Sequence, residues 1–242
     1  MDGYCEPADV RTALQETSLS GPTNESIVTD EIVGVSNWLR KQSGRHWYDS
    51  GGSTSDLVST DAETAGTVRL DVPSSPHAQR DQIHRYDRGV RYPVTTDGPY
   101  ARLSLPHGYV ESIDALEVRD RSGDVAHWVA SSDYQEGRGE DYYVQEEDRE
   151  GHGRSYLYLR AASIGARRDY SGLVTADYTY GLDYQSEPWD DVQRGVALLT
   201  AAQVVVDDDV LAAIPDNGQL IGVDTQAQQL ADRGERYLEP YL

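Results

Sequence analysis

The clearest hydrophobic pattern in the chain is a run of apolar residues at helical spacing that follows Pro188. Its main positions are separated by four, three and seven residues: Val192, Val196, Leu199 and Val206. Alanine, leucine and valine fill most of the remaining circumference. Proline suits the first helical position because its missing N–H would have no partner there. The pattern predicts a helix that is apolar on most sides and must pack into a core or against a neighbouring subunit.

Weaker patterns of the same period predict two helices before this one and one after it. Pro7 opens the first helix, which ends before a Gly-Pro pair. The second ends at Gly44 and carries its apolar face on five residues: Ile27, Ile32, Val35, Trp38 and Leu39. The last helix, over residues 223–236, is largely polar, with a thin apolar side. All four helices are expected to share one core.

Between residues 100 and 180 the pattern changes to the alternation of apolar and polar residues that is typical of β-strands. Strands are predicted at 102–105, 110–119, 125–130, 142–144, 156–159 and 173–180. Glycine-containing turns separate them, with a hairpin signal at residues 121–124. These strands predict a meander that forms one antiparallel sheet with one buried face.

The expected fold class is therefore α+β: a helical bundle of two N-terminal and one or two C-terminal helices, with an inserted antiparallel β-sheet module. The expected boundaries are 1–48 for the first helices, 49–99 for an irregular excursion, 100–182 for the β module and 183–242 for the C-terminal buried helix with a docking tail. Within the excursion, residues 50–79 are rich in Gly, Ser, Thr, Asp and Pro, with one short strand expected at 67–72.

The balance of acidic and basic residues limits the classes of function that this protein can have. The 242 residues include 42 Asp and Glu against 21 Lys and Arg, for a formal net charge of −21. Lys41 is the only lysine, and phenylalanine is absent. Such a surface stays hydrated in molar salt, where the Debye length falls to about 3 Å, so a halophilic source is expected. The charge also argues against tight nucleic-acid binding, because no basic stripe can displace counterions from phosphates, while a channel through which DNA slides without sticking is compatible with it.

No catalytic, cofactor or metal site is predicted. Nucleotide-binding loops and metalloprotease helices are absent from the sequence, and the six histidines do not pair at ligand spacing. Cys5 is the only cysteine, which excludes an internal disulfide and multi-cysteine zinc sites and predicts an inert thiol. No apolar run reaches membrane-spanning length, and the first residues lack the pattern of a signal peptide, so a soluble protein that stays inside a cell or an assembly is expected.

Four short motifs stand in a characteristic order along the chain. A Gly-Arg-x-Trp segment ends the second helix at residues 44–47, and a Leu-x-Leu-Pro segment follows at 103–106. An Asp-x-x-Gly hairpin lies at 120–123, and a Tyr-x-Tyr-Gly segment at 178–181 closes the β module. With the order of helices and strands, this chain resembles the head-tail connector adaptors, the head-completion proteins of tailed bacteriophages. The excursion and the polar C-terminal extension depart from that family's pattern.

The resemblance implies a structural, non-enzymatic virion protein. It would form a ring, expected to hold about twelve copies, beneath the portal protein, and bind a downstream neck or tail protein. DNA would pass through its channel without specific binding. Family members use their C-terminal segment to reach the portal, which carried onto this chain implicates Leu230, Tyr237, Leu238, Tyr241 and Leu242. With the composition, the source would be a tailed virus of a haloarchaeon, assembled in the host cytoplasm and located at the head-tail junction.

Three alternatives remain from the sequence. One is another neck or tail component, such as a stopper or tail terminator. The second is a halophilic hydrolase that uses acidic residues, which would need a pocket holding two carboxylates or a histidine with a perturbed pKa. The third is a carbohydrate-binding β module, which would leave the apolar helix that follows Pro188 without a role.

Overall fold

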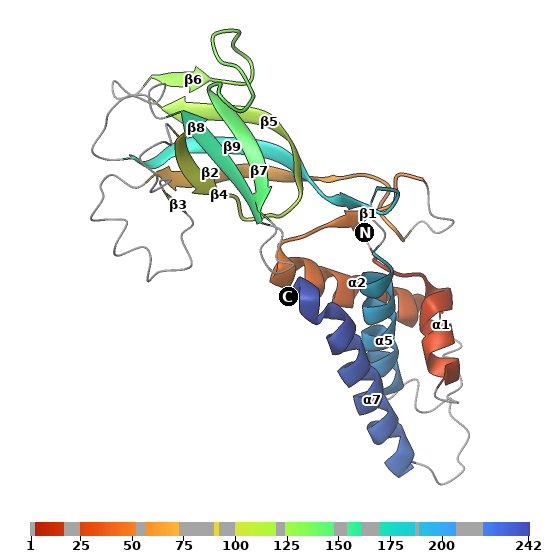
Figure 1. Cartoon of the computed structure of the whole chain (residues 1–242). Helices are drawn as coiled ribbons and strands as arrows, with labels where there is room; N and C mark the ends of the chain where they lie inside the picture. The colour runs from red at the N-terminus through yellow and green to blue at the C-terminus, as the bar shows by residue number, and fades with distance from the viewer. Residues whose placement is uncertain are drawn as a thin grey trace. The chain divides into compact units, whose positions relative to one another are not determined.

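The computed structural model describes residues 3–16, 25–51, 57–72, 90–91, 100–119, 124–147, 154–160, 170–186, 189–206 and 220–242. The chain divides into two compact units (Figure 1). The helical unit combines residues 1–62 with residues 182–242, and the β unit is the continuous stretch 63–181. The β unit is thus inserted between the helices that precede it and those that follow it. This confirms the α+β fold class.

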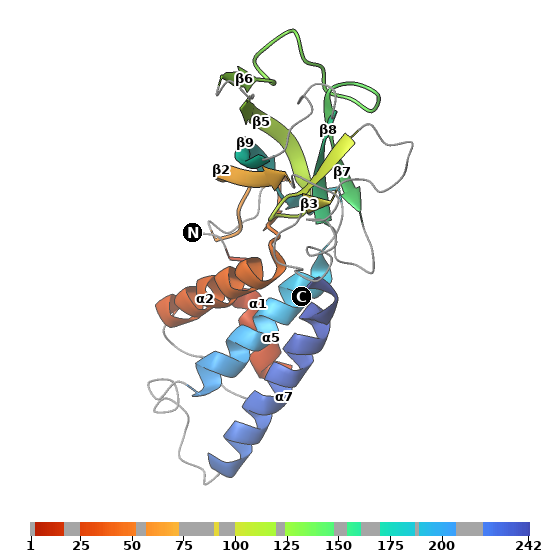
Figure 2. The same ribbon diagram turned by 90° about the vertical axis from the view of Figure 1, so that its left-hand side faces the viewer.

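The described part of the helical unit contains α-helices, a short sheet and a 3-10 turn. The helices are α1 (Pro7–Glu16), α2 (Glu25–Ser43), α5 (Asp190–Val206) and α7 (Leu220–Leu238), and the turn η1 (Glu239–Tyr241) follows α7. Strands β1 (Trp47–Tyr48) and β10 (Leu182–Asp183) pair in parallel. In Figure 2, α5 lies against α1, α2 and α7. No helix in the described ranges has the length and hydrophobicity needed to cross a bilayer.

Helix α5 lies at the centre of the helical core. Val192 and Val196 are fully buried, and Leu199 is half-buried against the same cluster. Val206, at the end of the helix, is 55% exposed. Other helices of the same chain therefore cover most of α5, and among the described residues nothing covers one edge near its C-terminus.

The apolar face predicted for α2 is wrong at one position. Trp38 is 40% exposed, whereas Val28 is fully buried in the helical core. The buried residues Val28, Ile32, Val35 and Leu39 follow one another at intervals of four, three and four residues. Trp38 immediately precedes Leu39, so it lies about 100° away around the helix and points off the buried stripe.

The β unit consists of two antiparallel sheets, each with four strands among the described residues. The first, in spatial order, contains β2 (Glu63–Val72), β9 (Tyr170–Tyr180), β5 (Val110–Arg119) and β6 (Val125–His127). The second contains β3 (Val90–Arg91), β4 (Tyr100–Ser104), β8 (Arg154–Arg160) and β7 (Tyr142–Glu147). Both sheets contribute to one hydrophobic cluster, with Leu116 and Val174 from the first and Leu103 and Leu157 from the second.

The prediction of a single meandering sheet is therefore wrong. Strand β9 does not pair with β8, the strand before it in the sequence, but lies between β2 and β5. Each sheet buries one face against the other, so the alternation along each strand is the same as in a one-sheet arrangement. Alternation identifies the buried face of a strand but not its neighbours.

The segment 49–99 also differs from the expected irregular excursion. It contains β2, a ten-residue strand paired with β9, so the β unit begins near residue 63 instead of residue 100. The register shifts between Ala65 and Val68. This bulge puts inward-facing residues three positions apart, which hides the two-residue period from sequence inspection. Within residues 50–79, the stretches 52–56 and 73–79 lie outside the described residues.

Candidate interaction surfaces

Cys5 and His46 are two chemically reactive side chains that lie in the packed core of the helical unit. Within the described ranges, no group of three or more His, Cys, Asp or Glu could hold a metal ion. Cys5 is fully buried, and its pKa is raised because burial disfavours the thiolate and Asp9 and Glu6 repel it. The buried His46 ring lies 3.2 Å from the Tyr4 hydroxyl through Nδ1. These groups tie the segment before α1 to the rest of the helical core.

A second histidine links loop and strand inside the β unit. His107 Nδ1 lies 2.8 Å from the hydroxyl of Tyr178, and the His107 ring stacks on Tyr180 with centroids 4.0 Å apart. Burial raises the pKa of Tyr178 well above its usual value. The Tyr180 hydroxyl donates to Glu63 Oε2 at 3.0 Å. The Tyr-x-Tyr-Gly motif at the end of β9 therefore acts in folding and connects β9 with β2.

The Gly-Arg-x-Trp motif is likewise part of a core. Gly44 ends α2 with a φ of 65°, a conformation that suits glycine. Arg45 and Trp47 are buried, and Trp47 meets the Tyr241 ring edge-on with centroids 5.9 Å apart. The Arg45 guanidinium carbon also lies 5.9 Å from the centroid of the Tyr241 ring. The 3-10 turn after α7 thus packs onto the segment after α2. The Asp-x-x-Gly hairpin lies outside the described residues.

The five residues that the family resemblance implicates in portal binding divide into two groups by their burial. Leu230 and Leu238 are fully buried in the helical core, and Tyr241 is half-buried against it. Tyr237 and Leu242 are 38% and 45% exposed. The buried leucines anchor α7 to α5 and offer no surface to a partner. Of these five residues, Tyr237 and Leu242 present the apolar surface.

A groove with a volume of about 820 Å³ runs along the open edge of α5. It is lined by residues of α2, α5 and α7: Glu31, Leu199, Ala202, Gln203, Val206, Ala227, Gln228, Ala231 and Glu235. Leucine, valine and alanine make its apolar part, while Glu31 and Glu235 are acidic. We call this the α5–α7 groove. It is the part of the apolar helix that the described residues leave accessible.

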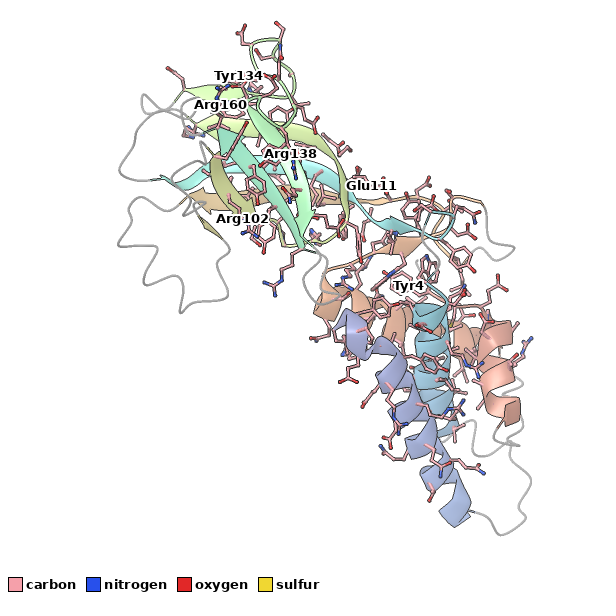
Figure 3. All side chains as sticks on the ribbon, viewed as in Figure 1. Tyr4, Arg102, Glu111, Tyr134, Arg138 and Arg160 are labelled. Atoms are coloured by element: carbon pink, nitrogen blue, oxygen red, sulfur yellow. The ribbon has the colours of Figure 1, made fainter. Side chains whose placement is uncertain are left out.

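The outer face of the β3-β4-β8-β7 sheet carries arginines and tyrosines. In β8 the leucines at 157 and 159 are buried in the β core, so the alternating residues 154, 156, 158 and 160 face outward. The register puts Arg102 of β4 and Tyr143 of β7 opposite Tyr158. We define the arginine–tyrosine face by six residues: Arg102, Arg138, Tyr143, Tyr156, Tyr158 and Arg160. Figure 3 labels its three arginines.

Side chains of the arginine–tyrosine face pack against one another. The Arg102 guanidinium carbon lies 3.6 Å from the centroid of the Tyr156 ring. Tyr143 and Tyr158 stack with centroids 4.6 Å apart and planes at 1°. Arg138 donates to Gln145 Oε1 at 2.8 Å and lies over the Tyr143 ring. The sequence analysis missed this face, although the Arg-Ser-Tyr-Leu-Tyr-Leu-Arg run of β8 contains the signal.

Comparisons with known proteins add a similarity to a solved structure. No family model matches the chain, and no curated protein sequence matches it. A chain in the solved structure of the neck of an empty GTA (gene transfer agent) particle, computed with C6 symmetry, is 13% identical, with a TM-score of 0.42. The match covers 91% of this chain and 87% of that one. The functional interpretation therefore depends on the order of elements and the surfaces of this chain.

Proposed function

We propose that this protein is a structural component of a virion neck: a head-tail adaptor that forms a ring under the portal, connects the capsid to the tail and lines the DNA channel. One observation carries the proposal. Helices from before and after the β unit form one helical unit, with the motifs of the adaptor resemblance at residues 44–47, 103–106 and 178–181. This is the arrangement that the resemblance implies.

The open edge of α5 supports assembly into a ring. In a closed ring each subunit meets its neighbours through two different surfaces, so an apolar strip that one chain leaves accessible can be covered by the next copy. The α5–α7 groove, with Val206 55% exposed, is such a strip. We assign this groove to a contact with a neighbouring copy.

The charge of the chain fits a DNA channel. A formal net charge of −21 per subunit is multiplied by the number of copies in the ring. A negative potential repels phosphates, so DNA can slide past without sticking. The same acidic surface fits a tailed virus of a haloarchaeon, in which the ring would be assembled in the host cytoplasm.

The portal contact is proposed for the exposed end of α7 and the residues that follow it. Tyr237 and Leu242 are the two exposed members of the predicted set. The opposite surface of the ring would bind the downstream neck or tail protein. A stopper or tail terminator is the nearest alternative role, and a hydrolase or a carbohydrate-binding module is the alternative outside the virion.

The proposal is tested by the molar mass of the purified protein in molar KCl, alone and with the portal protein. Light scattering after size exclusion should show a discrete ring-sized complex on the portal, whether or not the free protein is a monomer. A protein that remains monomeric and does not bind the portal would contradict the adaptor role. Binding to the tail side of an assembled neck, without portal contact, would indicate a stopper or terminator instead.

A further inference from the structure

We propose that the arginine–tyrosine face is the surface through which one copy of this chain binds an acidic surface of the next copy. The proposal specifies a contact of the ring and rests on the proposed function for the closure of that contact into a ring. It identifies the occupant of the face by its chemistry, as protein carboxylates. It also identifies the source of those carboxylates, as a second copy of the same chain.

The charge of this face is opposite to that of the whole chain. The described outward-facing side chains of β4 and β8 include three arginines and no acid: Tyr100, Arg102, Ser104, Arg154, Tyr156, Tyr158 and Arg160. Strand β7 adds Tyr143 and Gln145, and its last residue, Glu147, pairs with Arg154. In the chain as a whole, acidic residues outnumber basic ones by 42 to 21. A second copy, with twice as many acidic as basic residues, therefore offers acidic surface that this face can bind. Opposite potentials attract the face toward the rest of a neighbouring copy.

The arginines of the face are held in place before any partner binds. Arg102 stacks on Tyr156, Arg138 is fixed by Gln145, and Arg160 Nη1 lies 3.5 Å from the carbonyl oxygen of Gly139. Stacking occupies the flat side of a guanidinium, while the N–H groups that bind carboxylates lie along its edge. A pre-positioned arginine loses less conformational entropy on binding. Arginine and tyrosine are also the side chains that most often dominate protein–protein interfaces.

The packing of the tyrosines favours protein over nucleic acid as the occupant. A protein that binds single-stranded nucleic acid stacks the bases on solvent-accessible aromatic rings. Here Tyr143 and Tyr158 stack on each other, Arg102 covers Tyr156, and Tyr158 is 8% exposed. The ring faces are therefore largely used inside the face, while the charged edges of the arginines determine what binds. The net charge of the chain further disfavours phosphates.

The like charges of two arginine–tyrosine faces prevent this face from pairing with itself. The face must therefore contact a different, acidic surface of the adjacent copy. We assign this contact to the heterologous class, in which different surfaces of adjacent copies meet and which closes into rings or continues as filaments. The arginine–tyrosine face would thus supply the directional contact of the proposed ring.

The test compares two variants that change the charge equally. Arg138→Glu/Arg160→Glu reverses two arginines of the face, and Arg11→Glu/Lys41→Glu reverses two exposed cations of the helical unit as the control. Sedimentation velocity over a range of protein and KCl concentrations measures self-association. We expect the face variant to weaken it by about tenfold or more and the control to stay within about threefold of wild type. Circular dichroism and thermal melting test whether both variants fold. If the charge-reversal variant of the face does not fold, Arg138→Gln/Arg160→Gln is used in its place.

The outcomes separate this proposal from the adaptor role. If wild type forms a ring on the portal and the face variant forms the same ring with the same affinity, the face proposal is wrong and the adaptor role stands. If wild type self-associates through this face but does not bind the portal, the face proposal stands and the adaptor role fails. A wild type that is monomeric in every condition contradicts both. Binding of a labelled oligothymidylate that only the face variant loses, with unchanged self-association, assigns the face to nucleic acid instead.

Discussion

Gly195 of α5 and Gly234 of α7 meet backbone to backbone inside the helical unit. A Cβ atom built on Gly234 would lie 3.0 Å from the carbonyl oxygen of Gly195, and one built on Gly195 would lie 3.2 Å from that of Gly234. Neither contact can be relieved by rotating a side chain. The absence of side chains at these two positions therefore sets how closely α5 and α7 approach.

Gly234→Ala should destabilise the helical unit. The new methyl group would also lie 2.8 Å from Cγ of Leu199, so the helices must move apart. Overpacking of this kind costs about 1–3 kcal/mol, which exceeds the gain of about 1 kcal/mol in helix propensity. Urea denaturation should show a lower free energy of unfolding. Gly34→Ala is the matched control, since a Cβ on Gly34 of α2 meets nothing within 4 Å. That variant should be more stable than wild type by roughly 0.5–1 kcal/mol.

Substitutions along α5 should separate folding from assembly. Leu199→Asp places a charge where the side chain packs against the helical core, and it should lower the free energy of unfolding by roughly 2–4 kcal/mol. Val206→Asp lies in the exposed part of the α5–α7 groove, and its stability should stay within about 1 kcal/mol of wild type. Its ring formation should nevertheless be lost. Wild-type-like assembly by either variant would contradict the role assigned to this helix.

The control for Val206→Asp is Gln229→Asp. Gln229 is exposed on α7 and is not among the residues that line the groove, yet the substitution adds the same charge. Light scattering with the portal should give a wild-type complex for Gln229→Asp and no ring for Val206→Asp. Equal losses in both would indicate a general effect of charge.

The exposed end of α7 should contribute to portal binding without contributing to stability. Tyr237→Ala combined with Leu242→Ala should weaken binding to the portal by about tenfold or more while the melting temperature stays unchanged. Tyr241→Ala should instead lower the melting temperature, because that ring packs edge-on against Trp47. Glu239→Ala, an exposed position in the same turn, is the control and should bind as wild type does. Normal portal binding by the double variant would exclude these two side chains.

Asp183 should make a pH-dependent contribution to the helical unit. Ser50 Oγ donates to Asp183 Oδ2 at 2.6 Å, and the backbone N–H groups of Ser50 and Gln185 donate to Oδ1 at 3.1 Å each. The bond from the Ser50 side chain, followed by those from the backbone, lowers the pKa of Asp183. A carboxyl group with a lowered pKa stabilises the fold above its ordinary pKa of about 3.9, and this contribution is lost as the pH falls through the folded-state value.

Asp183→Asn should therefore reduce stability at neutral pH, with a difference from wild type that shrinks below about pH 4. Denaturation curves from pH 7 downward measure this difference. Ser50→Ala removes the shortest of these hydrogen bonds, so adding it to Asp183→Asn should cost little more than Asp183→Asn alone. A difference that does not change with pH would show that the charge of Asp183 is irrelevant.

Cys5 should be unreactive in the folded protein. Its side chain is fully buried and its pKa is raised, so the thiolate that reacts with disulfide reagents is scarce and inaccessible. Modification should proceed only as the helical unit opens. A Cys5→Ala/Gln229→Cys variant, with its thiol on an exposed helix position, is the reactive control. Native Cys5 that reacts as quickly as this surface thiol would contradict the burial.

The helices were predictable from sequence because burial leaves an uninterrupted period. Val28, Ile32, Val35 and Leu39 are all buried, and their spacing indicates one face of α2 without any knowledge of its neighbours. Trp38 shows the limit of this reasoning. A large aromatic residue beside the buried stripe resembles a member of it, and only the positions of the other helices decide which side it faces.

The two-sheet arrangement was not predictable in the same way. Pairing of β9 with β2 and β5 depends on residues far apart in the chain, and alternation carries no information about partners. The arginine–tyrosine face depends on the same long-range register. Tyr143 and Tyr158 stack only because β7 and β8 place them directly opposite each other. Sequence alone treats each of them as one more outward-facing residue.

The helical unit is discontinuous in sequence, and this affects how each subunit folds during its synthesis. Helices α1 and α2 are synthesised before the entire β unit, and α5, on which both pack, is synthesised only after it. A chain that stops anywhere before α7 lacks part of this core, including Leu230 and Leu238. Truncated products therefore cannot complete the helical unit, and we expect them to be excluded from the proposed ring.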